Sequence, residues 1–246
     1  MLGLSHRYGE TQALSSVNFS VPPGQICGLL GPNGAGKTTT LSAITGTLLP
    51  DSGTIRLGGF APQDGLHARQ LLGYVPDSGG LYGLLSPREH MALSSDLHEL
   101  EPAVAQANIH TLVEQFGIGE ILDQRIDTLS KGQRQRTAIC CALLHQPRIL
   151  LLDEPLNGLD VDAARVLRDV IRTAADNGAA VLYCSHILDV VERLCDRAVI
   201  LSAGRVVADA PTSELVAKSS DATLESVFHD LTRSADVDEL SGAFDG

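Results

Sequence analysis

Eight consecutive residues near the amino end have the composition of a phosphate-binding loop. They match the pattern GxxxxGK[ST] and run Gly31, Pro32, Asn33, Gly34, Ala35, Gly36, Lys37, Thr38. Glycines allow backbone N–H groups to turn inward around phosphates, and a helix beginning at the end of the loop directs its positive dipole end at them. In this pattern the lysine reaches the β- and γ-phosphates and the last hydroxyl binds Mg²⁺. We therefore predict ATP and Mg²⁺ as cofactors, with Lys37 and Thr38 in these roles and Thr39 in the same turn.

Two adjacent carboxylates follow the most apolar strand of the sequence. Asp153 and Glu154 come directly after Ile149–Leu152. A parallel strand delivers its last side chains to the sheet edge at which ligands bind. Asp153 is suited to hold Mg²⁺, and Glu154 is suited to orient and deprotonate an attacking water. Adjacent carboxylates are also a common surface feature, so this prediction depends on their occurring together with the phosphate loop.

A second helix start suited to an anion lies roughly a hundred residues after the first. It runs Leu129, Ser130, Lys131, Gly132, Gln133, with Ser130 as the expected N-cap of the helix that follows. One phosphate chain does not need two such sites from the same chain. We infer that this second site serves a nucleotide held by another copy.

Short apolar strands alternate with amphipathic helices, which indicates an α/β fold with a mainly parallel sheet. Strands are predicted at 25–31, 54–57, 72–75, 148–153, 180–184 and 197–201, and helices at 36–46, 161–176 and 187–194. Between 85 and 127 the strand signal disappears, and Ser86 with Glu89 forms a capping-box pattern. We expect an inserted helical subdomain at 85–127 and a solvated acidic tail at 234–246.

The composition disfavours nucleic-acid binding. Eighteen basic residues stand against 30 acidic ones, a net charge of −12, whereas nucleic-acid affinity comes from basic groups that neutralise phosphates. Five Phe, four Tyr and no Trp also leave little for base stacking. No signal peptide is predicted, and the longest apolar runs fall far short of the roughly 18 residues that a membrane span needs. Any membrane role is therefore expected to come through a partner.

Taken in order, these motifs resemble the nucleotide-binding domain of ABC transporters, and the resemblance covers nearly the whole chain. Gly31 to Thr38 resembles the Walker A loop, Leu129 to Gln133 the ABC signature, and Ile149 to Glu154 Walker B. Asn157 to Asp160 resembles the D-loop, and Ser185-His186 the switch histidine.

The resemblance implies a P-loop NTPase (RecA-like) core with a mainly parallel sheet, an antiparallel N-terminal β part and an inserted helical subdomain. A single domain is then expected over 1–233. Its core would comprise 1–84 and 128–210, and its C-terminal helices would lie at 211–233.

Three further roles are implied by the resemblance alone. Tyr8 corresponds to the aromatic residue that stacks on adenine, although a Tyr at a strand end is more often packing. His186 would contact the γ-phosphate and help to hold Glu154, although a histidine after a strand is usually structural. Asp160 would link two subunits across their interface, or could equally cap the next helix.

The sequence departs from the family pattern at three places. Asp77 stands where the family usually has a Gln that contacts Mg²⁺ and the attacking water. It can ligand Mg²⁺ or accept hydrogen bonds, or it merely caps a turn. Lys131 stands where Gly is commonest, beside the partner's phosphates or directed to solvent. Only seven residues precede Tyr8, so we expect either a truncated first strand or a natural start other than Met1.

The implied function is that of an ATP-hydrolysing subunit that dimerises head to tail around two ATP molecules, most simply as a homodimer. Each ATP would lie between the Walker A loop of one copy and Ser130, Gly132 and Gln133 of the other. It would drive a separate membrane permease docked on the helical subdomain, from the inner face of the cell membrane. Finer features around 81–90 and 224–228 resemble the branch that serves ABC-2-type permeases, mostly exporters. The alternative is an ABC ATPase that drives a membrane complex by mechanical signalling without transport. A nucleic-acid or ribosome-acting ABC ATPase is disfavoured by the charge, the single domain and the absence of a long coiled coil.

Overall fold

Five parallel strands form the centre of the computed structural model, which describes residues 1–217 and 223–233. The sheet has the order β5-β6-β7-β3-β8-β9, in which only β9 runs antiparallel to its neighbour. These strands are β3 (Ile26–Leu30), β5 (Leu72–Val75), β6 (Ile149–Asp153), β7 (Ala180–Cys184), β8 (Arg197–Ser202) and β9 (Arg205–Pro211). A mainly parallel sheet is confirmed, and all five parallel strands end at the same edge.

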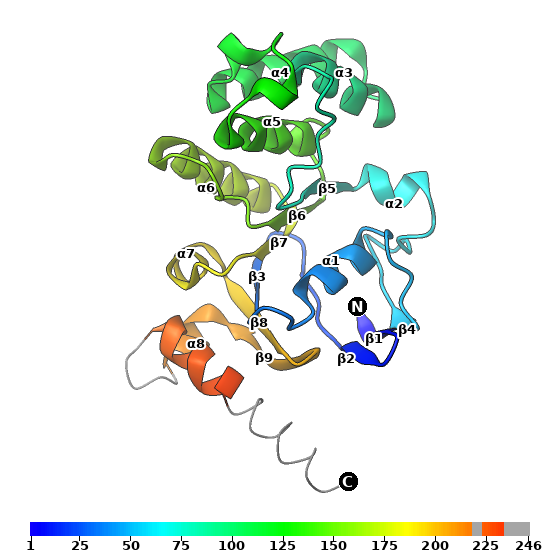
Figure 1. The fold of residues 1–246 in the computed structure, drawn as a ribbon, viewed down its shortest axis with the longest axis vertical. Helices are drawn as coiled ribbons and strands as arrows, with labels where there is room; N and C mark the ends of the chain where they lie inside the picture. Colours follow the sequence, from blue (N-terminus) through cyan, green and yellow to red (C-terminus); the bar gives the residue numbers. More distant parts are fainter. Residues whose placement is uncertain (218–222, 234–246) are drawn as a thin grey trace, which may run out of the picture.

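Both faces of this sheet are covered, which explains why its parallel strands are mostly apolar. In β6, Leu150 and Leu152 face one side and Leu151 faces the other. The first side packs against helices α3 to α7, and the second against α1 and the N-terminal sheet. Figure 1 shows α1 on one side of the sheet and α6 and α7 on the other. The helices on these faces are α1 (Lys37–Ile44), α3 (Pro87–Leu97), α4 (Pro102–Phe116), α5 (Lys131–Leu143), α6 (Val161–Asp176) and α7 (Leu188–Leu194).

A separate antiparallel sheet has the order β2-β1-β4 and confirms the expected antiparallel N-terminal part. Its strands are β1 (Leu2–Tyr8), β2 (Thr11–Val17) and β4 (Ser52–Thr54). A truncated first strand is not observed, because β1 has seven residues and pairs on both sides.

The strand predicted at 54–57 is wrong in position. The observed strand β4 ends at Thr54, and the chain then makes a tight hairpin in which Leu57 and Phe60 exchange backbone hydrogen bonds of 2.7 and 3.0 Å. Ile55 and Leu57 are nevertheless buried, in the cluster beneath α1. The alternation of apolar and polar residues at 54–57 therefore reflects the burial of two side chains in a turn, not a strand.

The segment from 87 to 128 is helical throughout its regular elements. It contains α3, α4 and two short 3₁₀ turns, Gly119–Ile121 and Ile126–Thr128. The predicted capping box at the start of α3 is present: Ser86 Oγ accepts from Glu89 N at 3.3 Å, and Glu89 Oε2 accepts from Ser86 N at 2.8 Å.

The remaining helices are α2 (Leu66–Gln70), α8 (Thr212–Ala217) and a helical stretch at 224–233. The tail predicted at 234–246 lies outside the described residues. None of the helices in the described part of the chain has both the length and the hydropathy that a membrane-spanning segment requires. All five cysteines are free thiols.

Two histidines stack where the helical segment meets the sheet. The rings of His98, at the end of α3, and His145, after α5, lie 3.5 Å apart between centroids at 5°. His145 Nε2 lies 3.2 Å from the Leu72 carbonyl at the start of β5. Burial and the neighbouring His98 lower the pKa of His145 to about 4, and the hydrogen bond with the Leu72 carbonyl opposes this shift only in part.

We expect this pair to make the fold acid-sensitive. A histidine whose pKa is lowered by folding binds its proton more readily when unfolded, so stability is complete above about pH 6.5 and is lost as pH falls toward 4. The loss attributable to His145 should be about 2–3 kcal/mol. Urea unfolding at pH 7.5 and pH 4.5 should show a smaller acid loss for His145→Gln than for wild type. The exposed His110→Gln should keep the wild-type loss, and an equal loss in His145→Gln would contradict the assignment.

Candidate functional site

The phosphate-binding pattern forms the turn between β3 and α1. Gly36 is the N-cap of α1 with φ 102°, a conformation that glycine adopts freely. A Cβ at Gly36 would lie 2.7 Å from the Ala13 carbonyl, and one at Gly31 would lie 2.5 Å from the Leu201 carbonyl. Neighbouring backbone therefore leaves no room for a side chain at either glycine of this turn. No side chain caps α1 and no acidic residue lies in its first turn, so its amino end is suited to an anion.

The residues of this turn differ in their exposure to solvent. Asn33, Gly34 and Thr38 are exposed, Ala35 and Gly36 are buried, and Lys37 and Thr39 are half-buried. The Lys37 ammonium lies across the turn and donates to the carbonyls of Gly31 at 2.5 Å and Pro32 at 3.0 Å. Phosphate oxygens would replace these carbonyls as its acceptors.

Asp153 ends β6 at the same sheet edge, beside Cys184 at the end of β7. Burial raises the pKa of the Asp153 carboxyl; a hydrogen bond from the Cys184 thiol and the charge of Lys37 oppose this, and the charges of Asp77 and Glu154 add to it. Lys37, Asp77 and Glu154 therefore lie close enough to Asp153 for their charges to act on its carboxyl.

Glu154 is held at both carboxylate oxygens. His186 donates to Oε1 from its backbone N at 2.9 Å, and its Nδ1 lies 2.7 Å from the same atom. Ser185 Oγ donates to Oε2 at 3.1 Å. The Glu154 side chain is 15% exposed, and its φ of 48° is a left-handed conformation that few non-glycine residues adopt. Such backbone conformations cluster at functional sites, where surrounding contacts maintain them.

Asp77 is exposed two residues after β5 and accepts a hydrogen bond from Asn157 Nδ2 at 3.0 Å. Thr38, Asp77 and Asp153 supply hydroxyl and carboxylate oxygens, the donor class that Mg²⁺ prefers. Among the described residues, no group of three or more His, Cys, Asp or Glu side chains could hold a metal ion by itself. This donor set fits a cation that takes its remaining ligands from water and phosphate, as Mg²⁺ usually does.

The signature residues begin α5, with Ser130 as N-cap in a complete capping box. Gln133 N donates to Ser130 Oγ at 3.2 Å, and Ser130 N donates to Gln133 Oε1 at 2.9 Å. α5 packs against β5, whereas α1 follows β3. Two strands separate β5 from β3, a spacing of about 14 Å at 4.8 Å per strand. The signature and the phosphate loop are thus separate sites on one chain.

Asp160 and Tyr8 have local roles in the single chain. Asp160 caps α6, with Oδ1 accepting from Ala163 N at 2.8 Å, and its Oδ2 pairs with Arg136. The Tyr8 ring, at the end of β1, is 54% exposed and packs edge-on against His6. Among the described residues, His6 is the only aromatic ring in contact with Tyr8.

Comparison with known proteins decides the family. The family model described as ABC transporter matches residues 14–157, more than half of the chain. The chain belongs to the ABC transporter family. It is an ATP-binding subunit and an ATPase of such a transporter, as predicted from the motifs.

Relatives of this ABC transporter subunit include proteins with named roles. It is 36% identical over 211 residues to "Nod factor export ATP-binding protein I" of Burkholderia orbicola (strain AU 1054), covering 85% of this chain and 69% of that protein. It is 34% identical over 212 residues to "Linearmycin resistance ATP-binding protein LnrL" of Bacillus subtilis (strain 168), covering 86% and 68%.

Solved structures agree with the P-loop NTPase fold. One described as "Structure of ATP binding subunit of ABC transporter" has a TM-score of 0.89 and 32% identity, covering 94% of this chain and 98% of that one. CbiO1 from Clostridium perfringens, described as part of the ABC transporter complex cbiONQ, has a TM-score of 0.74 and 25% identity, covering 88% and 89%.

Several contacts of this ABC ATPase escape sequence reasoning. Ser185 and Asn157 fall within recognised motifs, yet their bonds to Glu154 and Asp77 span 31 and 80 residues of sequence. The Lys131 stem lies over Gly158, with Cγ 3.1 Å from where a Cβ of that glycine would be. The sequence signal for Ser185 and Asn157 is that each is a polar residue within a known motif.

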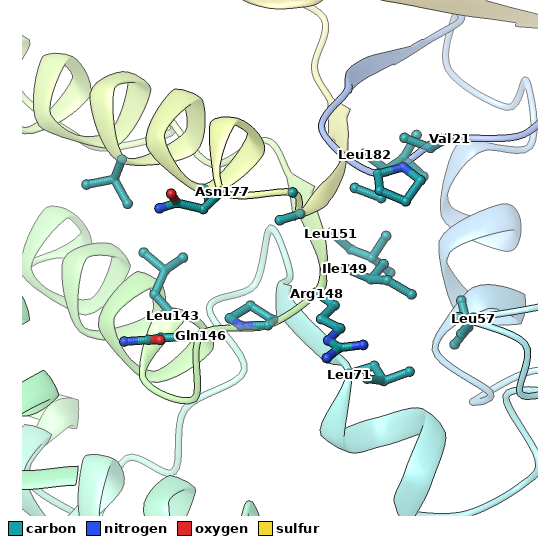
Figure 2. Close-up of a pocket in the computed structure, with 18 of the residues that line it drawn as sticks. Val21, Leu57, Leu71, Leu143, Gln146, Arg148, Ile149, Leu151, Asn177 and Leu182 are labelled. Carbon is teal, nitrogen blue, oxygen red and sulfur yellow. The ribbon is translucent and has the colours of Figure 1, made fainter. Parts of the chain in front are cut away.

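The ABC ATPase also has a large cleft at the opposite edge of its sheet. The cleft has a volume of about 1430 Å³ and lies at the amino ends of β6 and β7, between α4, α6 and the hairpin after β4. Figure 2 shows Arg148 extending between an apolar wall that includes Leu57 and Leu71 and the side formed by Leu143 and Gln146. Arg148 is exposed, and its guanidinium makes no ion pair or hydrogen bond with the described residues. This cleft is distant from the phosphate loop, so it is not the nucleotide site.

Proposed function

We propose that this ABC transporter subunit binds MgATP between two head-to-tail copies and uses its hydrolysis to drive a membrane permease, most consistently an exporter. The observation that carries the proposal is the Glu154 carboxylate, held by His186 and Ser185 at the sheet edge where Lys37 also lies. This arrangement supports a site in which Glu154 acts as the general base and Lys37 as the cation for the phosphates, with His186 beside them.

Within one copy, the phosphate loop and Walker B residues divide the work. The residues proposed to contact the phosphates and base are Tyr8, Gly31, Asn33, Gly34, Ala35, Gly36, Lys37, Thr38 and Thr39. Thr38, Asp153 and Asp77 would hold Mg²⁺, which neutralises charge on the phosphates when bound. Glu154 would accept a proton from the attacking water, and His186 would hold Glu154 and contact the γ-phosphate.

The second copy supplies the other half of the site. Ser130, Gly132 and Gln133 begin α5 away from their own phosphate loop, so a nucleotide that contacts both must lie between two chains. A twofold axis then creates two equivalent sites. Asp160 would lie at this interface and link the two copies across it. We propose a homodimer because one chain carries both halves.

The permease is proposed to dock at the cleft, beside the helical subdomain at 85–127. Its apolar wall suits a short amphipathic segment, and Arg148, which has no ion-pair partner among the described residues, suits an acidic side chain on that segment. The relatives named for Nod factor export and linearmycin resistance support an exporter of the ABC-2-type branch. This docking would place the subunit on the inner face of the cell membrane, with 1–233 as a single ATPase domain.

The docking proposal is tested by co-purification of this chain with its permease. Arg148→Glu introduces like charge against the acidic segment and should reduce co-purified permease at least fivefold, with ATP affinity unchanged. Arg233→Glu, exposed and outside the cleft, should keep wild-type recovery. Equal recovery with Arg148→Glu would place the permease elsewhere.

A further inference from the structure

The loop from 155 to 160 is fixed to the start of α5 by three contacts. Gln135 Nε2, buried in α5, donates to the Pro155 carbonyl at 3.0 Å. Gly132 lies so close to Gly158 that a Cβ at Gly132 would be 2.4 Å from its carbonyl oxygen. At the end of the loop, Asp160 pairs with Arg136. The signature helix and this loop therefore form one packed unit.

On its other side the same loop reaches Asp77 through a single side chain. Asn157 Nδ2 donates to Asp77 Oδ1 at 3.0 Å, across 80 residues of sequence. Asn157 is itself fixed, because its backbone N donates to the Glu154 carbonyl at 3.0 Å. Asn157 thus links the segment after β5 to the segment that carries the general base.

The charges around Asp77 explain why it needs this donor. The Asp77 carboxylate acts on Asp153 by like-charge repulsion, and Glu154 adds a third anion at the same edge. An exposed aspartate in that position gains free energy by turning away into water, where its charge is solvated and the repulsion is weaker. A donor that carries no charge and does not titrate can hold it in place, and the Asn157 amide is such a donor.

We propose that Asn157 is a positioning residue that holds the Asp77 carboxylate beside Asp153, so that Asp77 contributes to binding the cation of MgATP. The inference rests on the proposed function, and it assigns to Asn157 a task that a neutral glutamine at position 77 would not require. A direct consequence is that Asn157 acts only through Asp77.

Binding of adenylyl imidodiphosphate, titrated by calorimetry at a series of Mg²⁺ concentrations and in EDTA, tests the proposal without hydrolysis. Asn157→Ala should raise the half-saturating Mg²⁺ concentration about three- to tenfold, the range for loss of one hydrogen bond of ordinary net strength, because Asp77 is exposed to water. Affinity in EDTA should change less than about twofold, which also shows that the variant is folded. Asn108→Ala removes another asparagine donor, to the Leu144 carbonyl at 2.9 Å, and should bind as wild type.

Two double variants separate positioning from a general structural effect. In an Asp77→Ala background, Asn157→Ala should have no further effect on the Mg²⁺ requirement. Asn157→Asp should be worse than Asn157→Ala because it adds repulsion, and Asp77→Asn should partly rescue it by restoring a bond with donor and acceptor exchanged. Additive effects, or a wild-type Mg²⁺ requirement in Asn157→Ala, would overturn this inference alone. Absence of nucleotide binding by the wild-type protein would overturn the proposed function and this inference together.

Discussion

Replacing Lys37 by alanine should abolish measurable nucleotide binding. Its ammonium is half-buried, is directed across the turn, and already donates to two carbonyls that phosphate oxygens would replace. Charge-assisted hydrogen bonds contribute about 1.5–3 kcal/mol each, so losing two corresponds to a decrease in ATP affinity of about a hundredfold or more. Calorimetric titration of ATP into the purified chain measures it directly.

The best-matched control is the other lysine near a proposed phosphate contact. Lys131 is exposed and lies over Gly158, so Lys131→Ala should leave ATP affinity of the isolated subunit within about twofold. Lys37→Arg should fail like Lys37→Ala, because a planar guanidinium cannot take the place of a compact ammonium within the turn. If Lys37→Ala binds ATP with wild-type affinity, residues 31–38 are not the phosphate-binding loop.

Glu154→Gln should retain ATP binding while lowering turnover at least a hundredfold, the smaller end of what a general base contributes. The amide has nearly the same shape, and its oxygen can still accept from the backbone N of His186 or from Ser185 Oγ. ATP would then accumulate unhydrolysed and hold two copies together. Phosphate release and light scattering after gel filtration with ATP report the two effects.

Glu120→Gln provides the control for Glu154→Gln, since Glu120 is an exposed carboxylate in a 3₁₀ turn of the helical segment. It should turn over ATP at the wild-type rate and return to monomers as ATP is consumed. Native turnover in Glu154→Gln would show that another group accepts the proton. Loss of ATP binding would instead indicate that the carboxylate maintains the fold of the loop.

The sequence is most informative where an element is long or buried on both faces. The predicted and observed bounds agree for strands 72–75 and 180–184 and for helix 161–176. The strands are short apolar runs, and a charged residue stands at or next to each end of the helix. β9 and α2 are not predicted, since β9 is half-buried and α2 has only five residues. Short or partly exposed elements leave weak periodicity, and tertiary contacts decide them.

The candidate site shows the same division between local and distant information. The turn around Lys37 is a contiguous pattern, so its position and shape follow from sequence. The partners of Glu154 and Asp77 depend on which strands lie next to one another, and that order is a property of the folded sheet. Neither the Ser185 hydrogen bond nor the Asn157 hydrogen bond could be derived before β5, β6 and β7 were placed side by side.

One strand connects the two edges of this molecule. β6 begins next to Arg148 in the cleft and ends at Asp153, a length of about 13 Å over four residue steps. It is hydrogen-bonded along both sides by β5 and β7 and is covered on both faces, so it resists bending. Under the proposed docking, β6 would be a rigid element that transmits displacement from one of its ends to the other. A movement of the permease segment would reach the carboxylates as a translation of similar size, without a chain of rotamer changes between them.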